Sequence, residues 1–280
     1  MDTIVFIAVL FSAILHAIWN SMASKYKNKN VSIPAIVYGH VPLCVIAVIF
    51  LPGPSIESFP YIILSALIHQ GYQNFLLTAY KTGEFTTVYP IARGFGPLVA
   101  TLISIIFFGV YLKLFTILSI LLISIGVILI GLFSRSVLKS NRILYTSLIT
   151  GVFIGIYSVV DGNGARLSGS AVSYMSWVFI FSALFFPIIL HFRKQKNILR
   201  KTLTEGKFVF WIGGSFSYLA YVITVFAFTK APIPMVSALR ESSIIFAIFI
   251  GYFYLKDKIN FYKIISILLI FLGVIGLKIF

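Results

Sequence analysis

Ten long apolar stretches follow one another along the chain, and they constrain its fold more than any other feature of the sequence. Each is about 20 residues long, which is the length that an α-helix needs to cross the hydrocarbon core of a bilayer. The chain is 60% hydrophobic and only 10% charged, whereas soluble domains carry about 25% charged residues. A soluble protein this apolar would lack a polar surface, so the sequence predicts an integral membrane protein.

The expected spans are residues 3–24, 31–51, 60–80, 86–109, 114–133, 144–165, 170–191, 209–229, 232–254 and 261–278. Runs such as Ile120 to Ile130 are apolar on every face, which argues against the alternating strands of a β-barrel. The stretch 3–24 has no basic leader and no cleavage site, so we expect a retained helix. The longest loop is near 192–208 and leaves no room for a soluble domain. The predicted fold class is an all-α membrane protein of about ten transmembrane helices.

An internal repeat divides the chain into two halves. Residues 119–128 read SILLISIGVI and residues 266–275 read SILLIFLGVI, with eight of ten positions identical at an offset of 147. The same offset aligns Arg93 with Arg240 and Gly126 with Gly273. Each half, 1–138 and 139–280, holds five expected spans. An odd number of spans turns the second half upside down, which predicts two inverted five-helix repeats like those of many secondary transporters.

Basic residues gather in alternate loops and predict the orientation of the chain. Sixteen lie on one side and four on the other, and basic loops stay in the cytoplasm. The larger group consists of Lys25, Lys27, Lys29, Lys81, Arg135, Lys139, Arg142, Arg193, Lys194, Lys196, Arg200, Lys201, Lys207, Lys256, Lys258 and Lys263, and the smaller of Lys113, Arg166, Lys230 and Lys278. The basic 192–208 loop is therefore expected in the cytoplasm and both termini outside, in a multi-pass protein of the cell (inner, cytoplasmic) membrane.

Four charged residues lie inside expected spans, where a charge costs about 2.5–3.5 kcal/mol on insertion scales. They are Arg93, Asp161, Arg240 and Glu241. Arginine presents a forked set of donors suited to a carboxylate or phosphate, so the two arginines are candidates for the wall of a substrate cavity. Asp161 or Glu241 would bind a cationic group or take up a proton. The alternative is that the two acids neutralise the arginines as structural pairs.

Further polar and aromatic residues complete the candidate substrate site. His16 and Asn20 are four residues apart and share one face of the first helix, and His69 lies in the third span. A histidine can relay protons or simply bond to a neighbouring helix. Tyr157 aligns with His16 at an offset of 141. Trp177 is a candidate for an aromatic wall, although an interfacial belt or plain packing is the commoner role of such a residue.

No motif for another class of function is present. The sequence lacks a GxxxxGK[ST] loop, an HExxH pair, paired cysteines and a TVGYG-like filter. We therefore expect no enzyme activity, no cofactor and no metal. The net charge of +15 is explained by the loops, without a nucleic-acid partner. The expected partners are a small-molecule substrate, protons or a counter-solute, and the lipid bilayer; the sequence specifies no oligomeric state.

Four stretches give the chain a family resemblance: HAIWN at 16–20, AYKTGEFTTVYPIARGFGPL at 79–98, YSVVDGNGAR at 157–166 and ALRESSIIFAIFIGYFYLKDKI at 238–259. With these the chain resembles the drug/metabolite transporter superfamily, in its EamA-type ten-helix branch. Asp257 stands where this family usually has an acidic residue, but the first half has no acid at the corresponding turn. The motifs HAIWN, YPIARG and ALRESS are similar to those of a subgroup associated with phosphonate or amino-acid-like metabolites.

The resemblance implies a pseudo-two-fold fold with a central cavity lined by spans 1, 3, 4, 6, 8 and 9, and it supports His16, Asn20, Arg93, Asp161 and Arg240 as site residues. It also implies that both termini face the cytoplasm, against the count of basic residues, which we retain. The expected function is secondary transport of an amino-acid-like zwitterion or organic anion by alternating access, coupled to protons or to exchange. A carrier of organic cations and a non-transporting membrane scaffold are the alternatives.

Overall fold

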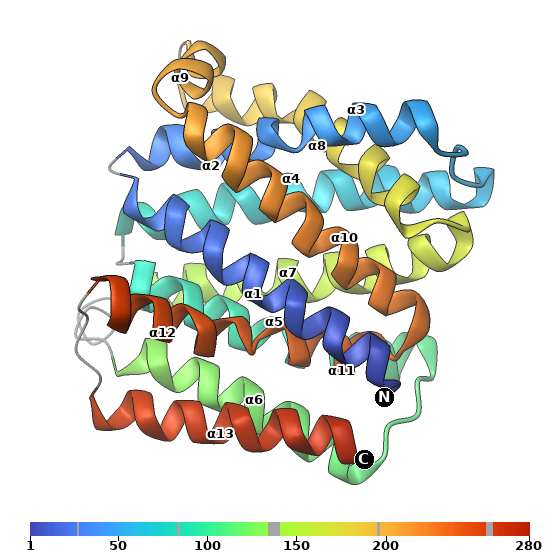
Figure 1. Cartoon of the computed structure of the whole chain (residues 1–280), viewed down its shortest axis with the longest axis vertical. Coiled ribbons are helices and arrows are strands. Elements are labelled where there is room, and N and C mark those ends of the chain that lie inside the picture. Colours follow the sequence, from blue (N-terminus) through green and yellow to red (C-terminus); the bar gives the residue numbers. More distant parts are fainter. Residues whose placement is uncertain (27, 83–84, 134–140, 195–196, 256–259) are drawn as a thin grey trace.

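The computed structural model describes residues 1–26, 28–82, 85–133, 141–194, 197–255 and 260–280. Lys27, Arg135, Lys139, Lys196, Lys256, Asp257 and Lys258, which entered the predictions above, lie outside these ranges. The described residues form a helical bundle with both termini on one side (Figure 1). Its helices are α1 (Thr3–Lys25), α2 (Lys29–Gly39), α3 (Val41–Phe50), η1 (Ile56–Ser58), α4 (Phe59–Thr82), α5 (Phe85–Phe108), α6 (Leu114–Leu132), α7 (Asn141–Ser168), α8 (Ala171–Phe192), α9 (Ile198–Thr204), η3 (Val209–Gly213), α10 (Gly214–Lys230), α11 (Ile233–Arg240), α12 (Ser243–Leu255) and α13 (Phe261–Ile279).

Nine segments of the described chain are long and apolar enough to cross a membrane. The helix missing from this count is α4, which has 24 residues and is therefore about 36 Å long. Its length suffices for a crossing, but His69, Gln70, Gln73 and Asn74 lower its hydropathy. The expected all-α membrane protein of about ten spans is confirmed, and the chain is a multi-pass membrane protein.

Two expected spans are interrupted. The second consists of α2 and α3, which meet at His40, and Pro42 in the first turn of α3 cannot donate the backbone bond that would continue α2. The ninth consists of α11 and α12. Between these two helices, the N–H groups of Glu241 and Ser242 donate to carbonyls three residues earlier, which is a tightened 3₁₀-type turn.

The stretch 192–208 is not simply the loop that the sequence suggested, because the short helix α9 lies within it. Apolar positions explain this helix: Ile198 is buried and packs in a small cluster with Val37, Phe186 and Leu190. The cluster joins α9 to α2 and α8 at one end of the bundle.

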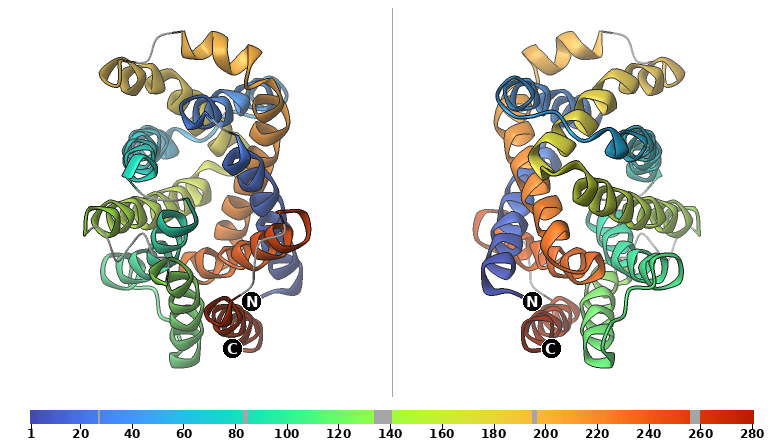
Figure 2. Two further views of the ribbon diagram at one scale, coloured as in Figure 1. Left: turned by 90° about the vertical axis from the view of Figure 1, so that its left-hand side faces the viewer. Right: turned by 90° about the vertical axis from the view of Figure 1, so that its right-hand side faces the viewer.

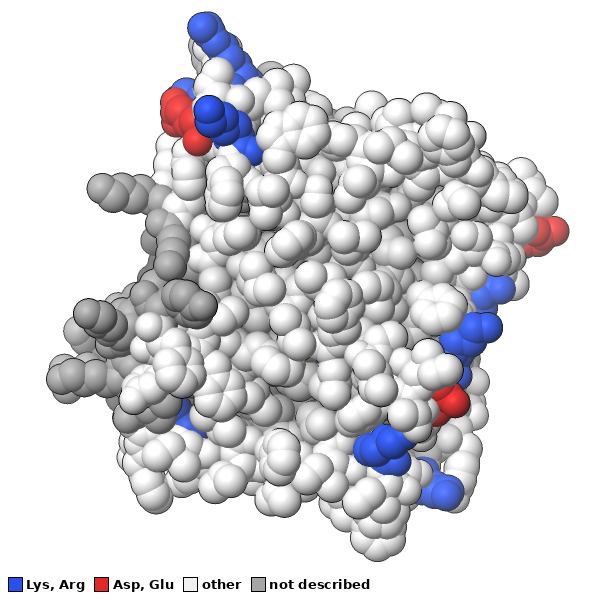
Figure 3. Space-filling model, viewed as in Figure 1, with Lys and Arg blue, Asp and Glu red and all other residues white. Residues whose placement is uncertain are grey.

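The surface of the bundle is mostly apolar. In Figure 3 the charged side chains lie near the two edges of the view, and the broad band between them is white. Large hydrophobic side chains are exposed on the surface of the bundle, including Ile49, Leu102, Leu184 and Phe226. Such exposure is costly in water but normal against lipid, since a lipid-facing surface has no need of polar groups.

Glycines allow α5 and α7 to approach closely. A Cβ atom on Gly151 would lie 2.7 Å from the Ala92 carbonyl oxygen, and one on Gly155 would lie 2.5 Å from the Cβ of Val99. From the other helix, a Cβ atom on Gly96 would lie 2.5 Å from Ile154. Small residues at a spacing of four permit such contacts between membrane helices. The close packing fixes α5, which carries Arg93, against α7, which carries Tyr157 and Asp161.

The helices α6 and α13 pack together at the edge of the bundle that lies furthest from α9 (Figures 1 and 2). Gly126 lies against Ser266 and Ile270 of α13, and Gly273 lies against Ser119 and Ile123 of α6. Both sets of contacts are related by the offset of 147 residues. Reciprocal contacts of this kind are what a local two-fold relation between two helices produces. An inverted relation between the complete halves stays a prediction.

Candidate functional site

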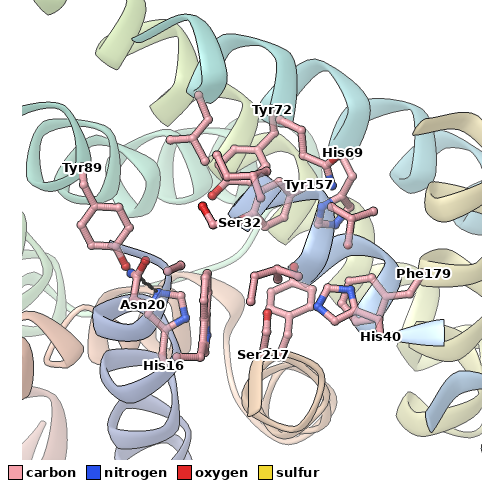
Figure 4. Close-up of a pocket in the computed structure, with 18 of the residues that line it drawn as sticks. His16, Asn20, Ser32, His40, His69, Tyr72, Tyr89, Tyr157, Phe179 and Ser217 are labelled. Carbon is pink, nitrogen blue, oxygen red and sulfur yellow. Dashed lines mark hydrogen bonds between the residues drawn. The ribbon is translucent and has the colours of Figure 1, made fainter. Parts of the chain in front are cut away.

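A cavity lies between the two halves of the bundle, with an empty volume of about 970 Å³ that includes its open mouth. Its wall comes from α1, α2, α4, α5, α7, α8, α10 and α11 together with His40. The described wall therefore includes α2 and α8, from the second and seventh spans, in addition to the six spans that the family resemblance implied. Figure 4 shows the labelled side chains of the wall facing a common space.

The cavity extends toward one end of the bundle. On α1 its lining runs from His16 to Ala23, close to the end of the helix, and on α2 it begins at Ser32, close to the start. On α4 it reaches Leu76. These helix ends lie on the side opposite the two chain termini (Figure 1). The lining thus extends to the side that the basic loops predict to be cytoplasmic.

Arg93 and Arg240 both line the cavity, although each is only 2% exposed. The Arg93 Nε donates to Glu241 Oε2 at 2.7 Å, and its Nη2 lies 3.5 Å from Ser243 Oγ. The Arg240 Nε is 3.9 Å from Glu241 Oε1. Glu241 is fully buried and lies behind the wall rather than in it. One carboxylate therefore serves two guanidinium groups, and it is bonded closely to only one of them.

The Arg240 guanidinium is incompletely paired. Its Nε and Nη2 atoms are buried and have no hydrogen-bond partner among the described residues. The guanidinium carbon lies 5.5 Å from the centre of the Tyr221 ring, a cation–π distance, and Tyr157 is close enough to interact electrostatically with it. Because buried donors are almost always satisfied, these two nitrogen atoms are an open position for an acceptor.

Asp161 lies directly behind the wall, fully buried, and does not line the cavity. It accepts hydrogen bonds from Ser65, from Tyr221 Oη at 2.6 Å, from Tyr174 Oη at 3.3 Å and from His69 Nε2 at 3.3 Å. Two of these partners, His69 and Tyr221, do line the cavity. The carboxylate thus orients two wall residues.

His16 and Asn20 line the cavity from the same face of α1, as their spacing suggested. The His16 Nε2 lies 2.6 Å from the hydroxyl oxygen of Tyr89 and 3.4 Å from Asn20 Nδ2 (Figure 4). His69 stacks on Tyr157 with ring centres 4.4 Å apart. The cavity therefore has histidines on two sides, each held by a tyrosine.

Of the nine predicted site residues, six lie in the wall. These are His16, Asn20, His69, Arg93, Tyr157 and Arg240. Asp161 and Glu241 lie one layer behind it. Trp177 is not part of the wall and packs against Phe59 and Phe181, with ring centres 6.3 Å and 5.9 Å apart.

The sequence did not single out several wall residues, among them Tyr72, Gln73, Tyr89 and Ser32. Gln73 Oε1 and Ser32 Oγ are buried without a hydrogen-bond partner among the described residues. The sequence did contain an indication for Gln73, because four polar residues, His69, Gln70, Gln73 and Asn74, lie close together on α4. Tyrosine is common both inside spans and at their ends, so Tyr72 and Tyr89 gave no signal.

Comparison with known proteins relates the chain to a family. Residues 141–279 match the model of the EamA-like transporter family. The chain is a member of this family. The match lies in the second half of the chain, and the family consists of transporters rather than enzymes. The protein is accordingly a membrane transporter of the drug/metabolite type.

Solved structures show the same fold. One crystal structure, described only as that of a protein, superimposes on the transporter with a TM-score of 0.71. The two sequences are 15% identical, and the match covers 98% of the transporter and 95% of the other chain. At this identity the likeness extends to the fold alone. None of the curated proteins matches the transporter.

Proposed function

We propose that the transporter moves a small metabolite bearing an anionic group, either an amino-acid-like zwitterion or an organic anion, by secondary active transport with alternating access. The observation that carries this proposal is the pair of Arg240 nitrogen atoms, Nε and Nη2, that have no hydrogen-bond partner among the described residues in the cavity wall. A carboxylate or phosphate is the natural partner of a guanidinium fork. A proton gradient or the exchange of solutes drives the movement.

The arrangement of charges favours an anion over a cation. Both arginines line the cavity, whereas Asp161 and Glu241 lie behind its wall with their charges turned to neighbouring side chains. An organic cation would meet the aromatic faces of Tyr157 and Tyr221 but would lie close to Arg240. The Coulomb repulsion between two cations is strong where water is largely excluded.

Three related compounds test the class of substrate. Phenylalanine carries a carboxylate and an ammonium group, phenylpyruvate only the carboxylate, and phenethylamine only the ammonium. We expect proteoliposomes containing the transporter to take up radiolabelled phenylalanine or phenylpyruvate, and not phenethylamine. Uptake of phenethylamine alone would favour the cation carrier. Failure of every compound in a broad metabolite screen to raise the melting temperature would favour the scaffold, since a ligand stabilises the protein that binds it.

The variant Arg240→Gln tests the binding residue. Loss of one charge-assisted pair should weaken binding of the anion about tenfold to a hundredfold. The matched control is Arg142→Gln, because Arg142 is exposed at the start of α7 and should leave uptake unchanged. Uptake by Arg240→Gln equal to that of the unmodified protein would exclude Arg240 as the anion site.

A further inference from the structure

The pair formed by His69 and Asp161 joins the cavity to a fully buried carboxylate. Asp161 is 0% exposed and accepts four side-chain hydrogen bonds, from Ser65, Tyr174, Tyr221 and His69. Among these four partners, only the histidine gains a charge near neutral pH. His69 also lines the cavity, so a proton can reach it from the same space as the substrate.

The hydrogen bonds determine where an added proton goes. An ionised carboxylate can only accept, so the His69 Nε2 carries the hydrogen that lies between it and Asp161 Oδ2. The second proton therefore binds to Nδ1, and it converts the neutral ring into an imidazolium beside the carboxylate. With His69 neutral, Asp161 is a buried charge without a positive partner among the groups that bond to it. Such a charge is costly, and the proton compensates it.

We propose that His69, with Asp161 behind it, is the binding site of the proton that drives transport. The proposal rests on the transport function proposed above and adds to it the coupling ion and its residue. No other solute is needed to balance this step. The proton enters from the cavity, adds to the lone pair of Nδ1 and leaves from the same atom after the transporter has changed its orientation.

The groups that surround His69 are mostly uncharged. Tyr72 on α4, Tyr157 on α7 and Tyr221 on α10 present aromatic rings at centre distances of 6.4, 4.4 and 5.9 Å. From α8, Phe179 adds an uncharged ring at 6.2 Å, and Tyr174 reaches the same carboxylate. His40, between α2 and α3, is near enough to interact electrostatically with His69. Asp161 is thus the one acid that bonds to His69 among the described residues.

Tyr221 connects the proton site to the anion site. Its hydroxyl donates to Asp161 Oδ2 at 2.6 Å, and its ring lies 5.5 Å from the guanidinium carbon of Arg240. A positive Arg240 disfavours a second positive charge on His69 nearby. An anion bound to Arg240 removes this repulsion and so favours the proton, and by linkage the proton favours the anion to the same extent. The geometry therefore favours joint movement of anion and proton in one direction.

Nitrogen-15 spectroscopy of histidine tests the proton site without any assumption about the substrate. The chain has four histidines, and the variant His69→Gln identifies the signal of His69 in the protein reconstituted in nanodiscs. Spectra recorded at successively lower pH should show a doubly protonated ring at this position, because histidine can bind a second proton. A ring that stays neutral throughout the series would overturn the proposal, whatever the protein transports.

Uptake measurements under a proton gradient test whether His69 couples the movement of the substrate to that of protons. With an inward proton gradient, the unmodified protein should accumulate phenylpyruvate at least tenfold over the outside concentration. The variant His69→Gln should only equilibrate it, yet should still exchange labelled for unlabelled phenylpyruvate at equal pH, because glutamine retains a donor for Asp161. His191→Gln is the control, since His191 is exposed at the end of α8, and it should accumulate normally.

The outcomes separate the two proposals. Accumulation by His69→Gln under the gradient would overturn His69 as the coupling site while leaving the proposed transport intact. If the unmodified protein takes up none of the three test compounds, the proposed function fails for them, and the histidine spectrum still decides whether His69 binds a proton. If His69→Gln does not fold, Asp161→Asn supplies the second test. The fraction of doubly protonated His69 should then fall, because the neighbouring negative charge is removed, and an unchanged fraction would count against the pair.

Discussion

The two arginines in the cavity wall differ in how they contact Glu241, the acid that lies behind the wall. Arg93 is committed to Glu241 by a bond of 2.7 Å, whereas Arg240 touches the same acid only at 3.9 Å. The sequence presents the two arginines as equivalent, because they align at the repeat offset. The structure makes them different, since Glu241 aligns with Gly94 and has no counterpart in the first half. Arg93 is thus held in place, whereas Arg240 keeps two nitrogen atoms without a hydrogen-bond partner among the described residues.

The stability of the protein should therefore depend on both members of the Arg93–Glu241 pair. Glu241→Gln leaves two buried guanidinium groups without an acid, and removal of one member of a buried pair costs about 3–5 kcal/mol. We expect Glu241→Gln and Arg93→Gln each to lower the melting temperature in detergent strongly. The double variant Arg93→Gln/Glu241→Gln should recover most of the loss, because it removes one charge of each sign. Additive losses in the double variant would show that the pair is not coupled.

Several pairs of helices approach each other closely at glycines. The pair α6 and α13 shows this best, because Gly126 and Gly273 each meet the partner helix at a backbone carbonyl oxygen. A carbonyl oxygen in a helix cannot move aside as the end of a flexible side chain can. The fit between these two helices is consequently sensitive to a single methyl group on either of them.

Gly126→Ala and Gly273→Ala should thus destabilise the transporter to a similar degree. The new Cβ atoms would lie 2.9 Å and 2.7 Å from the carbonyl oxygens of Ser266 and Ser119, and overpacking of this kind costs about 1–3 kcal/mol. Gly53→Ala is the control, because no atom lies within 4 Å of a Cβ atom there. Thermal unfolding in detergent measures all three. Stability equal to the control would contradict close contact between α6 and α13.

For the whole molecule, the apolar surface and the helical bundle followed from the sequence, because bilayer thickness and backbone hydrogen bonding leave few alternatives. The breaks at His40 and after Arg240 did not follow, since a hydropathy pattern records composition and not continuity. Arg93 and Arg240 could be predicted as cavity residues because a charge within a span needs a polar environment. The depth of Asp161 could not, because four partners from three other helices determine it.

Orientation in the membrane is a property of the whole chain, and the basic loops predict it. Single cysteines test it at Arg200 on α9 and at Gly53 before η1, in a Cys44→Ala background; Cys44 itself is buried. Both positions are exposed and lie on opposite sides of the bundle. A membrane-impermeant maleimide added to intact cells should label Gly53→Cys and not Arg200→Cys. The reverse pattern would place the termini in the cytoplasm.

The single acid shared by two arginines has a consequence for the valence of the cargo. Within this cluster, two guanidinium groups against one carboxylate leave one positive charge among buried side chains. A monovalent anion cancels that charge, whereas a divalent anion brings a surplus that the low dielectric constant makes expensive. Phenylpropionate should accordingly displace labelled phenylpyruvate at lower concentration than phenylsuccinate, which differs by one further carboxylate. Equal displacement by the two compounds would mean that the cavity recognises the shape of the anion and not its number of charges.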